Sequence, residues 1–307
     1  MIKTVLITGA TGLIGTRLAQ LLLNEGYVIH TLSRKGISGQ PEIKAFKWDP
    51  ERGTIDEKCL ENVDAIIHLA GESIAGKAWT KSRKQKIIRS RTDSVRLIYQ
   101  LIQNNPLSKV NTIISASAVG YYGDRADELL TEESLPGNDF MAQTCTTWED
   151  AVDYGESLGL RVVKLRTGIV LASEGGALPQ LAGTVRTGFG AVLASGKQWM
   201  PWIHLDDAVR MYKFVLTNEK ATGTYNQCSP NPVTNKQMTL AIADVLRKPL
   251  WLPRVPSFIL GIVLGEMKAV VLNSTRTSAG KILNLGFTFR FNTLGEALES
   301  IYGKKSR

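Results

Sequence analysis

Cysteine is scarce in this sequence, and no apolar run is long enough to span a bilayer. Its three cysteines, Cys59, Cys145 and Cys228, form no CxxC pair, so we expect neither a disulfide framework nor a zinc site, and the cytoplasm is the expected location. The longest apolar stretch, residues 255–272, is interrupted by charged residues and glycines and falls short of the roughly 20 residues that a span needs. We therefore expect a buried amphipathic helix there and no membrane partner. The apolar run at 5–7 is too short for the core of a secretion signal.

Blocks of like charge, which would indicate a nucleic-acid binder, are also missing from most of the chain. The 307 residues carry 37 Lys and Arg against 28 Asp and Glu, a net charge of +9, and these charges are scattered. The excess favours anionic ligands such as phosphorylated small molecules. Hydrophobic residues make up 43% and charged residues 21%, as in packed globular proteins, which excludes disorder, collagen and coiled coil for most of the chain.

Short apolar runs alternate with helical patterns through the first half of the chain. The runs lie at residues 5–7, 27–29, 65–67, 113–114 and 162–163, and helical segments are expected at 84–104 and 140–158. A strand that helices cover on both faces is apolar along its whole length. This order therefore predicts an α/β fold with a doubly wound parallel sheet.

A glycine-rich turn stands between the first predicted strand and the helix that follows it. Three glycines have the spacing GxxGxxG: the first allows a sharp turn, the second lets the backbone approach a pyrophosphate, and the third lets the helix pack on the sheet. The helix N-terminus favours an anion. The motif predicts a dinucleotide site of Rossmann type, with a merely structural turn as the alternative. The expected contacts of the cofactor are Gly9, Thr11, Gly12, Leu13 and Ile14.

The end of the second predicted strand indicates which dinucleotide is bound. NAD sites usually place an acidic residue there, about 20 residues after the glycine turn, to bind the ribose 2′-hydroxyl. This chain has the sequence LSRK at 32–35 and no acidic residue between Gly26 and Pro41. A guanidinium and a hydroxyl can bind the 2′-phosphate that a carboxylate would repel. We therefore predict NADP, read by Ser33 and Arg34; a solvated loop with two cations is the alternative.

After Leu171 the pattern becomes irregular. Glycine and proline punctuate residues 171–201 and predict a loop-rich excursion, and a further strand and helix begin at 202–207. From Pro230 onward we expect a smaller helical lobe that ends in a short strand near 287–289. The predicted division is a Rossmann domain at 1–170, completed by about 202–226, and a smaller C-terminal substrate or lid lobe formed by 171–201 and 227–307.

Several longer motifs lie outside the glycine turn. They are HLAGE at 68–72, SASAVGYYG at 115–123, WE at 148–149, LRTGIVL at 165–171, GKQWMPWIH at 196–204, PVTN at 232–235 and LGEM at 264–267. Together with the glycine turn they resemble the extended short-chain dehydrogenase/reductase superfamily, and more narrowly its atypical epimerase-family branch, over essentially the whole chain. The resemblance implies a sugar-nucleotide-epimerase-like, NADP-binding oxidoreductase.

The resemblance also assigns roles by position. In similar proteins the backbone at Leu69, Ala70 and Gly71 lies along the ribose and phosphates of the cofactor. Arg91 resembles a cofactor contact, and Val170 sits where the backbone passes the nicotinamide.

Some of these positions have plainer interpretations. His68 at a strand end is expected to be a core histidine with internal hydrogen bonds, and Arg91 has a solvated helix surface as its alternative. The basic run at 81–91 lies where the family places cofactor contacts, so we expect no nucleic-acid partner.

The usual proton-transfer pair of the superfamily is missing. Short-chain enzymes use a Tyr with a Lys four residues later, whose charge lowers the pKa of the phenol. No Tyr here has a Lys at that spacing, and the two places fall near Met141 and Cys145. Ser117, at the position of the carbonyl-polarising serine, is then expected to hydrogen-bond the substrate or nicotinamide. Tyr121 or Tyr122 is the candidate substitute acid, with ordinary packing as the alternative.

Further candidates lie nearby in the sequence. Glu72 is a candidate acid or base. Trp199, Trp202 and His204 are expected to line a substrate cleft, with His204 as a proton carrier; lid packing is the alternative for the tryptophans. No metal site is expected.

Two functions from different classes follow. The first is an NADP-dependent oxidoreductase or epimerase that acts on a small polar substrate, with a nucleotide sugar as the first class to test. The alternative is a non-catalytic NADP(H)-binding sensor or scaffold, because the Tyr-x-x-x-Lys pair is absent. An unidentified small molecule is the expected partner, and the sequence does not indicate an oligomeric state.

Overall fold

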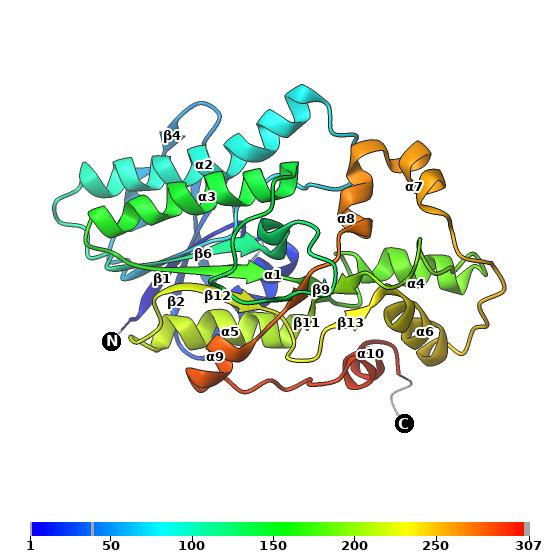
Figure 1. Cartoon of the computed structure of the whole chain (residues 1–307). Helices are drawn as coiled ribbons and strands as arrows, with labels where there is room; N and C mark the ends of the chain where they lie inside the picture. Colours follow the sequence, from blue (N-terminus) through cyan, green and yellow to red (C-terminus); the bar gives the residue numbers. More distant parts are fainter. Residues whose placement is uncertain (1, 38–39, 304–307) are drawn as a thin grey trace.

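The computed structural model describes residues 2–37 and 40–303. Within them the chain builds an eight-stranded sheet in the order β12-β8-β6-β5-β1-β2-β3-β4, parallel except for the antiparallel edge pair β3–β4 (Figure 1). The strands are β1 (Thr4–Thr8), β2 (Val28–Ser33), β3 (Ile43–Asp49), β4 (Thr54–Ile55), β5 (Ala65–His68), β6 (Thr112–Ala118), β8 (Arg161–Thr167) and β12 (Gly223–Gln227). The predicted doubly wound sheet is confirmed.

Helices cover both faces of the sheet. The helices α1 (Leu13–Asn24) and α5 (Leu205–Thr217) pack together over one face, and α2 (Lys81–Gln103) and α3 (Phe140–Ser157) cover the other (Figure 1). Every residue of β1 is buried for this reason, which explains the apolar run at its centre, residues 5–7. The 3-10 turn η1 (Glu57–Leu60) precedes β5, and η2 (Val119–Tyr122) follows β6.

A second group of elements packs beyond the carboxyl ends of the strands. The helices α4 (Leu178–Arg186), α6 (Asn235–Val245) and α10 (Leu294–Tyr302) share an apolar cluster with the buried Trp202. Short strand pairs link this group to the sheet: β9 (Ile169–Leu171) with β11 (Trp202–His204), β10 (Trp199–Met200) with β13 (Val233–Thr234), and β7 (Leu129–Leu130) with β14 (Arg276–Thr277). The predicted strand and helix at 202–207 are thus present as β11 and α5. The division into two domains stays a prediction.

Two expectations for this second group differ from the structure. Residues 255–272 form no single buried helix: α7 (Ser257–Leu264) ends at Gly265, whose φ of +56° stops the helix, and η3 (Gly265–Lys268) and α8 (Ala269–Leu272) follow. Every residue of α7 is at least partly exposed. The glycine-rich segment 171–201 contains α4 in addition to loops.

The expected strand at 287–289 is also wrong. These described residues, which follow α9 (Gly280–Asn284), are irregular. The rings of Phe287 and Phe289 pack edge to face, with their centres 4.9 Å apart, and both belong to the core beside α5. Aromatic residues are common in strands, but here the two rings are buried in the core from irregular backbone, without a partner strand. In the part of the chain that is described, every helix is too short or too polar to pass through a lipid bilayer.

Candidate functional site

The glycine turn between β1 and α1 leaves no room for side chains at two of its positions. Gly9 has a φ of +68°, and a Cβ there would lie 2.9 Å from the backbone carbonyl of Leu69. A Cβ at Gly15 would lie 2.2 Å from the carbonyl oxygen of Gly9. The amide of Gly12 donates to that same oxygen at 3.0 Å, which closes the turn. The turn, the helix and the loop after β5 therefore pack as one unit.

The N-terminus of α1 is suited to an anion. Its N-cap is Gly12, which has no side chain to cap the helix, and the first turn carries no acidic residue. The first amides of a helix have no intrahelical acceptor, and the helix dipole adds partial positive charge there. A cofactor pyrophosphate would accept from these amides. The residues present therefore fit a dinucleotide.

Two cavities flank the turn. The first, about 300 Å³, lies between α1 and the end of β2, and the second, about 380 Å³, lies between the turn and the β9–α4 segment. Of the predicted cofactor contacts, Thr11 and Ser33 line the first cavity, and Gly9, Gly12, Leu13, Ile14, Leu69 and Val170 line the second. An extended dinucleotide would occupy both, with its pyrophosphate over the helix N-terminus between them.

Ser33 lines the first cavity, and Arg34 follows it directly in the chain. The Ser33 hydroxyl accepts from the amide of Gly36 at 3.0 Å, which shapes the tight turn after β2. Arg34 is exposed; the pKa of Glu72 is lowered first by a hydrogen bond from Arg83, and the charges of Arg83, Lys86 and Arg34 add to this. An exposed guanidinium directly after Ser33 would meet a 2′-phosphate.

Thr8 fastens the loop after β5 to the glycine turn. Its hydroxyl oxygen accepts from the amides of Leu69 and Ala70, both at 3.1 Å, and lies 2.9 Å from Nδ1 of His68. The Nε2 of His68 lies 3.1 Å from the Ser94 hydroxyl on α2. Burial lowers the pKa of His68 to about 4, so the ring is neutral near pH 7. The geometry fits the core-histidine interpretation. Thr8 was missed from the sequence, although its place directly before Gly9 was a signal.

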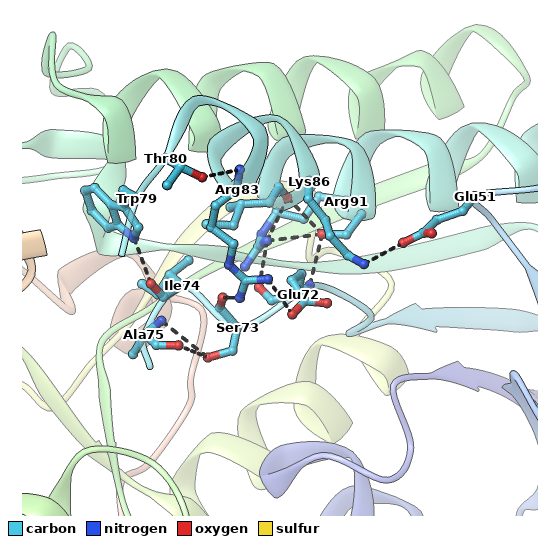
Figure 2. A network of polar contacts seen from close by, with 12 residues as sticks. Glu51, Glu72, Ser73, Ile74, Ala75, Trp79, Thr80, Arg83, Lys86 and Arg91 are labelled. Carbon is cyan, nitrogen blue, oxygen red and sulfur yellow. Dashed lines mark hydrogen bonds and ion pairs between the residues drawn. The ribbon is translucent and has the colours of Figure 1, made fainter. Parts of the chain in front are cut away.

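A network of polar contacts holds the next part of this loop (Figure 2). The Glu72 carboxylate accepts from Nη1 of Arg83 at 2.7 Å, and this bond is the main cause of its lowered pKa. The amide of Glu72 donates to the Ser90 hydroxyl at 2.9 Å. A carboxylate whose pKa is lowered by an arginine is rarely protonated near pH 7 and is also a weak base, so the candidate acid/base role of Glu72 fits the geometry badly.

Arg91 of α2 holds the same loop in place. Its Nη1 donates to the carbonyl of Glu72 at 3.1 Å and to that of Ile87 at 2.9 Å. Figure 2 shows Arg91 beside Glu72. A Cβ at Gly71 would lie 3.2 Å from its guanidinium carbon. Arg91 is half-buried, its guanidinium 5.1 Å from the centre of the Trp148 ring. The side chain is thus packed between α2 and the predicted cofactor loop rather than solvated on a helix surface.

Ser117 and Tyr122 belong to a buried polar network beneath the end of β6. Ser117 donates to Glu149 at 2.6 Å, and Glu149 is paired with Arg166 at 2.8 Å, all three side chains being buried. Arg166 also donates to the Tyr122 hydroxyl at 3.0 Å, which in turn donates to Asn226 at 2.7 Å. Alternation along β6 puts Ala116, a lining residue of the second cavity, on the face opposite to Ser117.

Neither hydroxyl group is therefore directed into the cofactor cavities. Tyr122 is fully buried, and burial raises its pKa above the usual value for a phenol. The ring of half-buried Tyr121 stacks on the Arg166 guanidinium at 3.4 Å. These positions fit the packing interpretation of both tyrosines better than a substitute acid, and they place Ser117 as a partner of Glu149.

Met141 and Cys145 lie where the superfamily's Tyr and Lys were expected. They face the turn after β6: a Cβ at Gly120 would lie 3.3 Å from Met141 and 3.8 Å from the Cys145 sulfur. Burial raises the pKa of the Cys145 thiol to about 12, so it is neutral near pH 7. Neither side chain can exchange a proton readily at neutral pH.

The tryptophans and His204 have structural partners. Trp202 is fully buried and donates to the carbonyl of Asn231 at 3.0 Å, and Trp199 donates to Asp127 at 2.8 Å. His204 is the N-cap of α5: its Nδ1 accepts from the amide of Asp206 at 3.0 Å. None of the three lines the described cavities, so the lid-packing interpretation fits Trp202 in particular. Among residues 2–37 and 40–303, no group of three His, Cys, Asp or Glu side chains could hold a metal ion.

The fold and the glycine turn define a Rossmann-type protein of the kind that binds dinucleotides. Residues 5–228 match the NAD dependent epimerase/dehydratase family, and residues 255–301 match a domain of unknown function, DUF1731. This chain belongs to the NAD dependent epimerase/dehydratase family.

Relatives match along the whole chain. "Epimerase family protein YfhF" of Bacillus subtilis is 36% identical over 297 residues, which cover 96% of each chain. An Arabidopsis thaliana relative, "Epimerase family protein SDR39U1 homolog, chloroplastic", is 35% identical over 97% of this chain and 86% of its own.

Solved structures show the same fold. Human epimerase family protein SDR39U1, solved with NADPH, superposes with a TM-score of 0.84 at 27% identity, covering 98% of this chain and 100% of that one. A nucleoside-diphosphate sugar epimerase from Corynebacterium glutamicum gives a TM-score of 0.78 at 32% identity, covering 99% of this chain and 59% of that one.

Proposed function

We propose that this protein binds NADP(H) and acts as an oxidoreductase or epimerase on a small polar substrate, with a nucleotide sugar as the first class to test. The observation that carries the proposal is the pair of cavities joined by the glycine turn, with Ser33 lining the first and the exposed Arg34 directly after it in the chain. The human relative solved with NADPH supports the choice of cofactor. A cytoplasmic location belongs to the same proposal.

Within this proposal the cofactor, when bound, supplies or accepts a hydride. The residues of this chain bind and orient it: the amides at the start of α1 hold the pyrophosphate, and Arg34 meets the 2′-phosphate. Thr8 and Arg91 fix the loop that runs along the ribose. The apolar lining of the second cavity, which includes Ile169 and Val170, keeps water away from the nicotinamide.

A second candidate function is a non-catalytic NADP(H) sensor or scaffold. A specific observation favours it: the positions of the usual proton-transfer pair hold Met141 and a neutral, buried Cys145 thiol. The nearby hydroxyls of Ser117 and Tyr122 are also committed to internal hydrogen bonds. If the protein is an enzyme instead, the proton would have to come from the substrate itself or from water.

Cofactor titration of the purified protein tests the choice of NADP. Arg34→Ala should weaken NADPH binding about 10- to 100-fold, the effect of one lost charge-assisted hydrogen bond, and change NADH binding far less. Arg96→Ala is the matched control, since Arg96 is an exposed arginine of α2 outside the described cavities. Tighter binding of NADH than of NADPH by the unaltered protein would refute the assignment.

A turnover assay separates the two candidate functions. The protein is incubated with NADPH and a panel of carbonyl compounds, and with NADP and a panel of nucleotide sugars. Oxidation of the cofactor or a change of sugar configuration supports the enzyme. Tight NADPH binding without turnover of any member supports the sensor or scaffold.

A further inference from the structure

The segment between α6 and η3 carries an exposed apolar surface outside both cavities. Phe258, Ile259, Ile262 and Val263 of α7 expose 67%, 40%, 79% and 74% of their surface, and Trp251, before the helix, exposes 78%. The spacing of the four α7 side chains places them on one stripe of the helix. We call these five residues the α7 patch. Exposed apolar side chains that gather in this way mark a contact surface.

Between its flanking acids Asp244 and Glu266, the segment that carries the α7 patch has only positive charges. Arg247, Lys248 and Arg254 are exposed, and the sequence has no acidic residue from 245 to 265. The Lys268 side chain lies along the back of α7, 3.8 Å from the place of a Cβ on Gly261. The patch therefore combines exposed aromatic and aliphatic side chains with neighbouring cations.

We propose that the α7 patch docks on the surface of a lipid bilayer that contains anionic lipids. Apolar side chains with a tryptophan enter the interfacial region of a bilayer, and neighbouring Lys and Arg are attracted to anionic headgroups. A second copy of this chain is a poorer occupant, because it would bring the same cations and a net charge of +9 against +9. Docking of this kind leaves α7 lying on the membrane rather than crossing it.

The fold presents the α7 patch on a fixed base. After α7, Glu266 pairs with Lys84 of α2, and Asn273 donates to Asp139 at the start of α3 at 2.6 Å. Figure 1 shows α7 and the segment that leads to it at the end of the molecule opposite the N-terminus. This proposal replaces the expectation of no membrane partner, which depended on a buried helix at 255–272. It does not depend on the choice of cofactor.

Flotation with lipid vesicles tests the proposal on the full chain. Vesicles of phosphatidylcholine with about 30% phosphatidylglycerol should bind at least about tenfold more protein than phosphatidylcholine alone, and added salt should weaken this binding. The double variant Phe258→Ser, Ile262→Ser should lose at least about tenfold in binding. The triple variant Arg247→Gln, Lys248→Gln, Arg254→Gln should lose the preference for the anionic lipid.

A matched control keeps the test specific. The double variant Leu107→Ser, Leu135→Ser removes two side chains that are 89% and 75% exposed elsewhere and should bind vesicles as the unaltered protein does. Circular dichroism and NADPH binding verify that each variant is folded. Brominated lipid should quench tryptophan emission, and Trp251→Phe should remove most of that quenching.

Three results would overturn the proposal. One is no binding to either vesicle by the folded protein, and another is equal vesicle binding by the α7 and control variants. The third is a dimer in light scattering that the Phe258→Ser, Ile262→Ser variant converts to a monomer without any vesicle binding, which would identify a second copy as the occupant.

Discussion

Buried polar side chains hold the candidate site together at the scale of single residues. Thr8 and His68 join β1, β5 and α2 beneath the cofactor loop. Glu149 and Arg166 join α3 to β8 beneath the turn after β6. Each of these groups has its hydrogen-bond partners in place, so removal of one partner leaves the other buried and unsatisfied.

Acid should destabilise the protein through His68. Burial lowers its folded-state pKa to about 4 against 6.5 when unfolded, so the unfolded chain binds the extra proton as the pH falls through this window. The contribution of neutral His68 to the free energy of unfolding is complete above about pH 6.5 and is lost as the pH falls toward 4. At pH 5 the loss is about 2 kcal/mol. Urea unfolding at pH 7.5 and pH 5 measures the loss. His68→Asn should show a smaller difference between the two pH values, and an unchanged difference would contradict the prediction.

Removal of the buried carboxylate at Glu149 should cost much more stability than loss of an exposed pair. Glu149→Gln leaves Arg166 buried without its counter-charge, which typically costs about 3–5 kcal/mol of unfolding free energy. The control Arg96→Gln breaks the exposed pair with Asp93 and should cost less than about 1 kcal/mol. Denaturant midpoints of the two variants give the comparison. Similar midpoints would mean that water reaches the Arg166 site.

The packing of whole elements decides which glycines can be replaced. Gly15 lies in α1 against the glycine turn, whereas Gly183 lies in α4 with no atom within 4 Å of the place where a Cβ would be. A methyl group therefore meets backbone in one helix and open space in the other.

Paired alanine substitutions test this difference. Gly15→Ala should displace the turn from α1 and abolish NADPH binding, because its Cβ would lie 2.2 Å from the carbonyl oxygen of Gly9. Gly183→Ala should leave NADPH binding unchanged and stabilise α4 by up to about 1 kcal/mol, since alanine favours helix. Isothermal calorimetry and thermal unfolding give the two readouts. Full NADPH affinity in Gly15→Ala would show that the turn tolerates a shift of the backbone.

The sequence predicts the elements whose signals are local. The central strands β1 and β5 carry apolar runs because both faces of the sheet are covered, and the glycine turn needs only its own residues to be recognised. The partners of Ser117 and Thr8 were not predictable, since Glu149 and His68 lie 32 and 60 residues away in the chain. At α7 the apolar sequence predicts burial, but its side chains are exposed, because sequence alone does not distinguish a core helix from an exposed one.

Charge and ligand binding act on the molecule as a whole. The net charge of +9 raises the local concentration of an anionic cofactor, and the cofactor cavities join segments from β1 to α4. A ligand that bridges so many elements stabilises the folded state by mass action.

NADPH should therefore protect the entire chain from heat. At a free concentration of 100 times its Kd it adds about 2.7 kcal/mol to the unfolding free energy, which corresponds to a rise in Tm of several degrees. NADH at the same concentration should give a smaller rise, and Arg34→Ala should reduce the NADPH effect toward that of NADH. Differential scanning calorimetry measures all three. Equal rises with both cofactors would argue against recognition of the 2′-phosphate.

The close packing around Gly9 means that the glycine turn and the residue that reads the 2′-phosphate differ in how far they can be redesigned. A side chain at that position would collide with the Leu69 carbonyl, so the pyrophosphate-facing part of the chain tolerates little redesign. Arg34, by contrast, stands exposed at the tip of a surface turn. A laboratory that wishes to exchange one pyridine coenzyme for another in this scaffold should randomise the tip and leave the packed turn as it is.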